Sequence, residues 1–164
     1  AGGNGPESGR HAIRFAPGTG ELGMFQGAKS YLLENPEGQT LDTYSISAGL
    51  DYASVGPEHA WLKDIGRVNY SWATDQEAMS AFKDLCETEG IIPAIESSHA
   101  VAGAYKAAAD LKAKGYEHPV MIINISGRGD KDMNTAGKWF GYLTDEQAKA
   151  LEANGAQGNN ADGE

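Results

Sequence analysis

The sequence predicts an α/β fold in which helices cover a parallel sheet on both sides, giving three layers. From residue 68 onward, short apolar runs alternate with helical patterns of 12 or more residues. Parallel strands need such a helix between them, so this alternation is typical of βαβ units. The run 120–126 (VMIINIS) is also mostly apolar without alternation. That pattern is typical of a strand buried on both faces, as in a parallel sheet.

The N-terminal third carries weaker signals. Residues 1–29 are rich in glycine and lack periodicity, so we expect mainly loop there. The segments 30–33 and 39–42 flank Asn35–Gly38 (NPEG), a favourable turn sequence, and together they predict a small hairpin. Pro57, followed by an acidic residue, predicts the start of a helix that ends at Gly66.

Three strands are predicted in the rest of the chain, at 68–73, 91–95 and 120–126. Thr74 and Glu77 form a capping box, which predicts a helix that begins there and ends at a glycine at position 90.

The remaining helices follow from local signals as well. A serine at position 97 or 98 is expected to cap an alanine-rich helix that reaches about Lys114. A short helix is predicted around Trp139, and a last helix from Thr144. We expect one domain over residues 1–153 and a disordered tail over 154–164.

Composition narrows the class of protein. The chain has 164 residues, 40% of them hydrophobic, which suits one globular domain. A net charge of −10 argues against nucleic-acid binding. A single cysteine, Cys86, excludes an internal disulfide and fits a reducing, cytoplasmic location. The sequence predicts neither a membrane span nor a signal peptide. Because it starts without methionine or a capped element, we expect a piece of a longer protein.

Polar residues follow the three predicted strands, at Thr74, Glu96 and Ser126. The carboxyl ends of parallel strands share one edge of a sheet, where ligands collect. Thr74 is explained as a helix cap. Glu96 either interacts with a helix dipole or faces a polar ligand, and Ser126 either faces a ligand or only terminates its strand.

The other motifs are less specific. The Ser126–Gly129 stretch lets a ligand approach backbone amides, but it lacks the spacing of nucleotide-binding loops. Oxygens of Tyr52–Ser54 either coordinate a hard cation or belong to a tight turn. His99 has no partner at zinc spacing. From the residues alone, the sequence predicts a small-molecule site at the edge of an α/β sheet.

Three longer stretches, 44–62, 89–100 and 124–132, resemble the β subunit of tryptophan synthase in sequence, order and spacing. The resemblance runs from about residue 2 to residue 132. This family makes L-tryptophan from L-serine and indole with pyridoxal 5'-phosphate (PLP), on a fold type II architecture. The resemblance therefore implies a PLP-dependent lyase of amino-acid biosynthesis, of which this chain is the C-terminal part.

The resemblance also implies site residues. Ser126 matches the serine whose hydroxyl faces the pyridine nitrogen of PLP, and Glu96 matches a carboxylate beside its ring. Asp51 matches the aspartate that swings toward the serine-derived intermediate as the site closes.

Two further features of the family map onto this chain. Tyr52 and Ser54 match positions whose backbone carbonyls bind a monovalent cation, Na⁺ or K⁺. Phe25 falls near an aromatic residue of the tunnel that delivers indole from the α subunit.

The Schiff-base lysine, the catalytic glutamate and the phosphate-binding cup lie upstream in the family. Lys29, Lys63 and Lys131 stand in the wrong contexts to replace that lysine, so we expect this chain alone to be inactive. Its implied partners are the missing N-terminal part, the α chain and a second β chain. Two alternatives remain: an autonomous α/β module that binds a phosphorylated metabolite, and a structural assembly domain.

Overall fold

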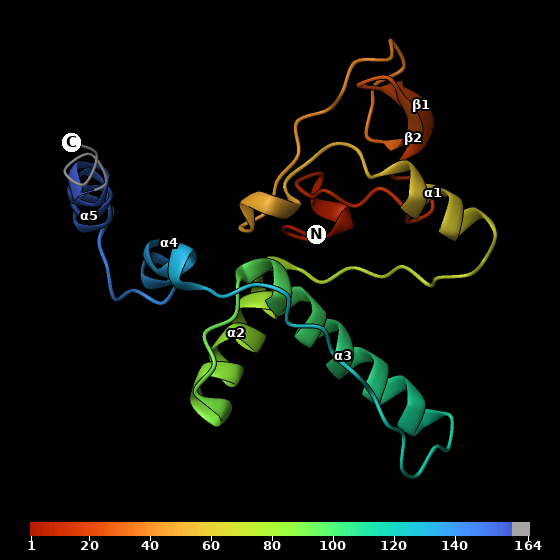
Figure 1. Cartoon of the computed structure of the whole chain (residues 1–164). Coiled ribbons are helices and arrows are strands. Elements are labelled where there is room, and N and C mark those ends of the chain that lie inside the picture. Colours follow the sequence, from red (N-terminus) through yellow and green to blue (C-terminus); the bar gives the residue numbers. More distant parts are fainter. Residues whose placement is uncertain (159–164) are drawn as a thin grey trace.

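The computed structural model of the chain describes residues 1–158 (Figure 1). Its elements are β1 (Glu21–Phe25), β2 (Ala28–Leu32), α1 (Pro57–Asp64), α2 (Asp75–Glu89), α3 (Ile95–Ala113), α4 (Met133–Trp139) and α5 (Asp145–Gly158). Short 3₁₀ turns occupy Pro6–Ser8, Ala48–Leu50 and Asp130–Asp132. The predicted mixture of helices and strands is confirmed.

The N-terminal part is built around an antiparallel hairpin of β1 and β2. Gln26 and Gly27 form its two-residue turn, and both have positive φ, at 50° and 78°. Such a turn matches the twist of paired strands. Strand β1 and the start of β2 lie within the region predicted to be mainly loop, because Gln26–Gly27 is a weaker hairpin signal than Asn-Gly or Asp-Gly.

The hairpin predicted around Asn35–Gly38 is only partly present. Its turn forms, since the Asn35 amide donates to the Gln39 carbonyl at 2.8 Å. Beyond that turn, the two arms share a single bridge, between Glu34 and Thr40. The arm 30–32 pairs instead with β1, its nearest neighbour in the sequence.

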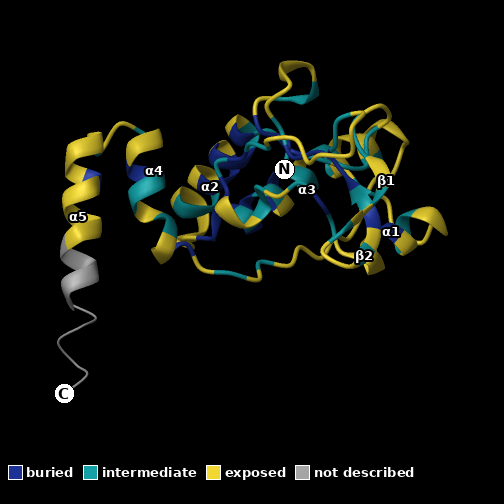
Figure 2. Ribbon diagram, turned by 90° about the horizontal axis from the view of Figure 1, so that it is seen from above, coloured by how far each residue is buried: buried dark blue, intermediate teal, exposed yellow. Residues whose placement is uncertain are grey.

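Helices α2 and α3 pack against each other and carry most of the core. One cluster joins Met79 and Phe82 of α2 to Ile95 of α3 and Ala136 of α4. The other consists of Ala73, Ala81, Val101 and Ala102. Burial is concentrated in the middle of the molecule, while residues 145–153 of α5 are exposed except for Ala148 (Figure 2). Burial of these apolar side chains is what fixes α2 against α3.

The capping signals located most helix ends correctly. The Thr74 hydroxyl accepts from the Glu77 amide at 3.2 Å, and the Glu77 carboxylate accepts from the Thr74 amide at 2.8 Å. Thr144 and Gln147 make the equivalent pair at α5. Helix α3 differs, since it begins at Ile95, inside a predicted strand, rather than at a serine cap.

The predicted parallel sheet is not formed within residues 1–158, where the only sheet is the β1–β2 hairpin. The segments 68–73 and 120–126 are extended but have no strand beside them. Val120 is 93% and Ile122 97% exposed. A strand needs a neighbouring strand to pair its backbone amides and carbonyls, and the described part of the chain offers these segments none. In 68–73 the Trp72 and Ala73 carbonyls are instead bonded by Lys106 Nζ and by the Gly2 amide.

Among the described helices, none is both long and apolar enough to cross a membrane. Helix α5 includes residues 154–158, where the disordered tail was predicted to begin. The remainder of that predicted tail, 159–164, lies outside the described residues.

Candidate functional site

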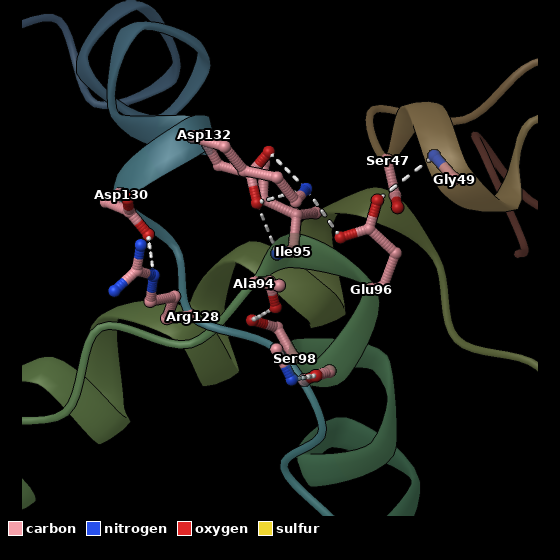
Figure 3. A network of polar contacts seen from close by, with 12 residues as sticks. Ser47, Gly49, Ala94, Ile95, Glu96, Ser98, Arg128, Asp130 and Asp132 are labelled. Carbon is pink, nitrogen blue, oxygen red and sulfur yellow. Dashed lines mark hydrogen bonds and ion pairs between the residues drawn. The ribbon is translucent and has the colours of Figure 1, made fainter.

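Three segments that are far apart in the sequence meet at the N-terminus of α3 (Figure 3). They are the loop 45–51, the stretch 92–97 that leads into α3, and the segment 126–132. We call their meeting point the α3 cluster, defined by Gly49, Glu96, Ser97, Gly127, Lys131 and Asp132.

Backbone hydrogen bonds join two of these segments. The Ala94 amide donates to the Gly127 carbonyl at 2.9 Å, and the Gly129 amide donates to the Ile92 carbonyl at 2.9 Å. A side chain at position 129 would not fit, because its Cβ would lie 2.1 Å from the Pro93 carbonyl oxygen. Glycine is therefore what allows this close approach of backbone to backbone.

Asp132 holds the first turn of α3. Its Oδ2 accepts from the Ile95 amide at 2.9 Å, although the two residues are 37 positions apart. The first amides of a helix have no partner within the helix. Asp132 therefore caps the N-terminus of α3 from a distant part of the chain. This explains why α3 begins at Ile95, before either predicted serine cap.

Lys131 bridges two carboxylates. Its Nζ lies 2.9 Å from Glu96 Oε2 and 2.8 Å from Asp132 Oδ1. The same carboxyl group of Glu96 accepts from the Gly49 amide at 3.0 Å, through Oε1. Glu96 thus ties the loop 45–51 and the segment 126–132 to α3.

The α3 cluster keeps Glu96 ionised. Partial burial by itself would raise the pKa of Glu96, but the hydrogen bonds from Lys131 and from backbone amides, including that of Gly49, outweigh it. The net effect lowers the pKa of Glu96 from its ordinary value of 4.5 to about 2. Glu96 therefore presents a negative charge at any pH near neutrality.

A second carboxylate, Asp75, anchors the loop 45–51 from the other side. Asp75 is 2% exposed, and its Oδ2 accepts from the Ile46 amide at 3.0 Å. Burial raises its pKa above the ordinary value. His99, one turn into α3, bonds the Ile95 carbonyl through Nδ1 at 2.8 Å. Because a carbonyl only accepts, Nδ1 is the protonated nitrogen, and burial lowers the pKa of the ring.

Some buried polar atoms of this region have no hydrogen-bond partner among the described residues. They include Asp51 Oδ1 and His99 Nε2. Buried polar groups in proteins are nearly always paired, so these atoms keep the capacity to bond a group outside the described residues. No group of three or more His, Cys, Asp or Glu side chains in the described part of the chain is arranged to hold a metal.

Another group of side chains surrounds the end of β1. Phe25 and Tyr52 pack edge to face, with ring centroids 5.7 Å apart. The Tyr52 hydroxyl donates to Gln26 Oε1 at 2.9 Å. These residues and Ser54 line a cavity of about 200 Å³. The backbone carbonyl of Tyr52 accepts a hydrogen bond from Arg14 Nη1 at 2.5 Å.

Comparison with known proteins identifies the family. Over 143 residues the chain is 59% identical to the tryptophan synthase beta chain of Mycobacterium tuberculosis, and over 144 residues it is 56% identical to that of Mycobacterium leprae. Over 154 residues it is 49% identical to the tryptophan synthase beta chain of Streptomyces coelicolor. These alignments cover 87%, 87% and 94% of this chain. The chain belongs to the tryptophan synthase β-chain family.

The predicted family resemblance is thereby confirmed. The chain spans about a third of the length of these β chains, at 32%, 33% and 35%, and corresponds to their C-terminal part. No family model matches the chain.

The structure places the predicted β-chain site residues in two groups. Glu96 lies in the α3 cluster, Asp51 is two residues beyond Gly49, and Ser126 directly precedes Gly127 and is exposed. Phe25, Tyr52 and Ser54 form the group at the end of β1.

The sequence does not indicate the roles of four residues of the site. A structural role is expected for Asp132, but no local pattern shows that Asp132 and Lys131 hold α3 and Glu96, and Asp75 lies within the helix start predicted at Thr74 without a signal of its own. Arg14 lies in a stretch without periodicity. The charged run Asp130–Asp132 beside a glycine loop was the one available signal, since such a run commonly pairs with charges elsewhere.

Proposed function

We propose that this chain supplies the part of a tryptophan synthase β chain that lies against the ring of PLP. The complete β chain would condense L-serine with indole to L-tryptophan by β-replacement. The observation that carries this proposal is the convergence of Asp51, Glu96 and Ser126, each within two residues of a contact in the α3 cluster, in a chain that belongs to this family.

The residues present fit the ring of PLP. Ser126 offers an exposed hydroxyl next to Gly127, which packs closely on α3 since a Cβ there would lie 3.0 Å from Ala94 Cβ, and Glu96 offers a fixed negative charge. PLP, when bound, supplies the electron sink that such a reaction needs at the substrate Cα. The phosphate would be held by residues upstream of this chain.

Each residue has a distinct role in the proposal. Ser126 would face the ring nitrogen, and because its hydroxyl is neutral it would not force that nitrogen to stay protonated. This would make the electron sink milder and favour replacement over transamination. Glu96, held by Lys131, would lie beside the ring. Asp51 moves toward the substrate on closure, and its Oδ1, which is buried and has no partner within residues 1–158, gains one in that state.

The upstream part of the β chain would complete the sheet. We propose that its strands pair with 120–126, covering Val120 and Ile122, and that the result is the parallel sheet of a fold type II enzyme. The α chain and a second β chain are the further partners in this proposal. Since the lysine that binds PLP covalently would lie in the upstream part, the isolated chain is inactive.

The test is reconstitution. This chain is co-expressed with the remaining N-terminal part of the M. tuberculosis β chain, and tryptophan formation from L-serine and indole is measured with PLP present. We expect activity from the assembled pair and none from either part. Glu96→Gln and Ser126→Ala lower kcat at least tenfold, whereas Glu87→Gln and Ser80→Ala, at exposed positions of α2, leave it unchanged.

Gel filtration shows in the same experiment whether the two parts have assembled. Assembled protein that binds PLP but makes no tryptophan would refute the proposed activity. Tryptophan synthesis by this chain alone would refute the proposed dependence on the upstream part. Saturable binding of inorganic phosphate to the isolated chain would favour the autonomous binding module instead.

A further inference from the structure

We propose that the guanidinium of Arg14 takes the place of a bound monovalent cation at the Tyr52 carbonyl. At Tyr52, one of the two residues predicted to bind such an ion through their carbonyls, the positive charge is then supplied by a side chain of the protein itself. The inference rests on the proposed function only in that it concerns a carbonyl beside the proposed site.

The first observation is the contact itself. Arg14 Nη1 donates to the Tyr52 carbonyl oxygen at 2.5 Å, across 38 positions in the sequence. Arg14 is half-buried, and no carboxylate of the described residues forms an ion pair with it. A partly buried charge needs compensation, and here a backbone carbonyl dipole provides it.

The second observation is that both partners are held in place. Ala12 and Ile13, before Arg14, are 0% and 4% exposed. Phe15, after it, packs edge to face against Tyr31 and Tyr70, at centroid distances of 5.3 and 4.6 Å. The Arg14 backbone is therefore fixed on both sides.

On the acceptor side, the Tyr52 ring packs on Phe25 and its hydroxyl bonds Gln26. The guanidinium thus meets the carbonyl between two anchored segments, at a point that is open to solvent, since Tyr52 is 46% exposed.

The third step concerns charge. A monovalent cation bound by carbonyls needs oxygens that point at it, as in other sites where carbonyls replace the hydration shell of an ion. The guanidinium already places a positive charge at the Tyr52 oxygen, and a second cation there would be repelled. Burial lowers the pKa of Arg14, but arginine remains protonated in proteins. The charge at this carbonyl is therefore permanent and does not depend on dissolved ions.

The test measures thermal unfolding of this chain in NaCl, KCl or CsCl against choline chloride at the same concentration. We expect one melting temperature for the unmodified chain in all four salts. Arg14→Met keeps the length of the side chain and removes its charge. Its melting temperature should be lower in choline chloride and should rise saturably, by about 5–10 °C at 100 times Kd, with Na⁺, K⁺ or Cs⁺.

Arg10→Met is the matched control. Arg10 lies over the Tyr44 ring, 4.2 Å from its centroid, and does not contact Tyr52 in the described structure. This variant should show no cation dependence. Saturable, ion-specific stabilisation of the unmodified chain would overturn the proposal, and so would a folded Arg14→Met variant that responds equally to all four salts.

A measurement on the unmodified chain covers the case in which Arg14→Met does not fold. The ¹⁵N signals of the Arg14 guanidinium should be protected from solvent exchange and should not shift when K⁺ replaces choline. Loss of that protection in K⁺ would overturn the proposal. Neither measurement involves PLP or tryptophan synthesis, so failure of the proposed function would leave both results unchanged.

Discussion

Replacement of Lys131 by methionine tests how the α3 cluster holds Glu96. In the structure Lys131 Nζ lies 2.9 Å from Glu96 Oε2 and 2.8 Å from Asp132 Oδ1. Methionine keeps much of the length of the side chain and removes its charge. The variant therefore removes the charged partner of Glu96 while the neighbouring donors of the loop 45–51 and of the backbone remain, and the pKa of Glu96 should rise from about 2 toward its ordinary value of 4.5.

The magnitude follows from the same pKa. A fall from 4.5 to about 2 is equivalent to about 3 kcal/mol, at about 1.4 kcal/mol per pKa unit. Lys131 supplies only part of that, and its side chain is 55% exposed, so solvent weakens the pair. We expect Lys131→Met to lower the free energy of unfolding by about 1–2 kcal/mol at pH 7.

The pH dependence has a definite sign. Because folding depresses the pKa of Glu96, the stabilisation is fully present above pH 4.5 and is lost as the pH falls through about 2. The difference in free energy of unfolding between Lys131→Met and the unmodified chain should therefore be constant above pH 5 and shrink below pH 4.5.

Two measurements check the prediction. Urea unfolding at pH 7 gives the loss of stability, and the ¹³C shift of the Glu96 carboxyl carbon gives its titration. Lys83→Met is the control, because it removes an exposed pair with Glu87 that is worth about 0.5 kcal/mol at most. If Glu96 still titrates near pH 2 in Lys131→Met, Lys131 does not hold its charge and the reasoning fails.

Two further predictions concern the framework of the site. Gly129→Ala should lower the free energy of unfolding by about 1–3 kcal/mol and speed hydrogen exchange at the Ala94 amide, because its Cβ would lie 2.1 Å from the Pro93 carbonyl oxygen. Gly103→Ala on α3, where a Cβ meets nothing within 4 Å, should instead stabilise the chain in urea; equal losses for both would contradict this account. Thr74→Ala should cost about 1 kcal/mol in the same assay and Thr74→Ser much less, since only the serine keeps the hydroxyl that caps α2.

The sequence predicted the helices well where their signals are local. The capping box at Thr74 and the glycine at position 90 fixed both ends of α2, and Gly90 has the expected positive φ of 67°. The start of α3 could not be predicted in this way. Its first amide is satisfied by Asp132, 37 residues further on, and no local pattern indicates such a contact.

The site shows the same division between local and distant causes. Glu96 and the segment after Ser126 were expected to lie together at a sheet edge. They are adjacent in the structure, but the N-terminus of α3 and backbone bonds between 92–94 and 127–129 bring them together. The parallel strands were predicted wrongly because a hydrophobic pattern indicates which residues become buried, and not which strand pairs with which. The residues of 120–126 have the composition of a buried strand, but no strand pairs with them among the described residues.

The exposed run 120–124 has a consequence for the fate of the free chain. It joins four apolar residues with no charged one, and its backbone groups are open for pairing. Short uncharged segments of this kind stack into cross-β aggregates when they meet their own copies. In the proposed assembly, pairing with the rest of a β chain and aggregation would compete for the same amides and carbonyls. Aggregation requires several copies of the chain to meet, so dilution should favour the proposed pairing over aggregation.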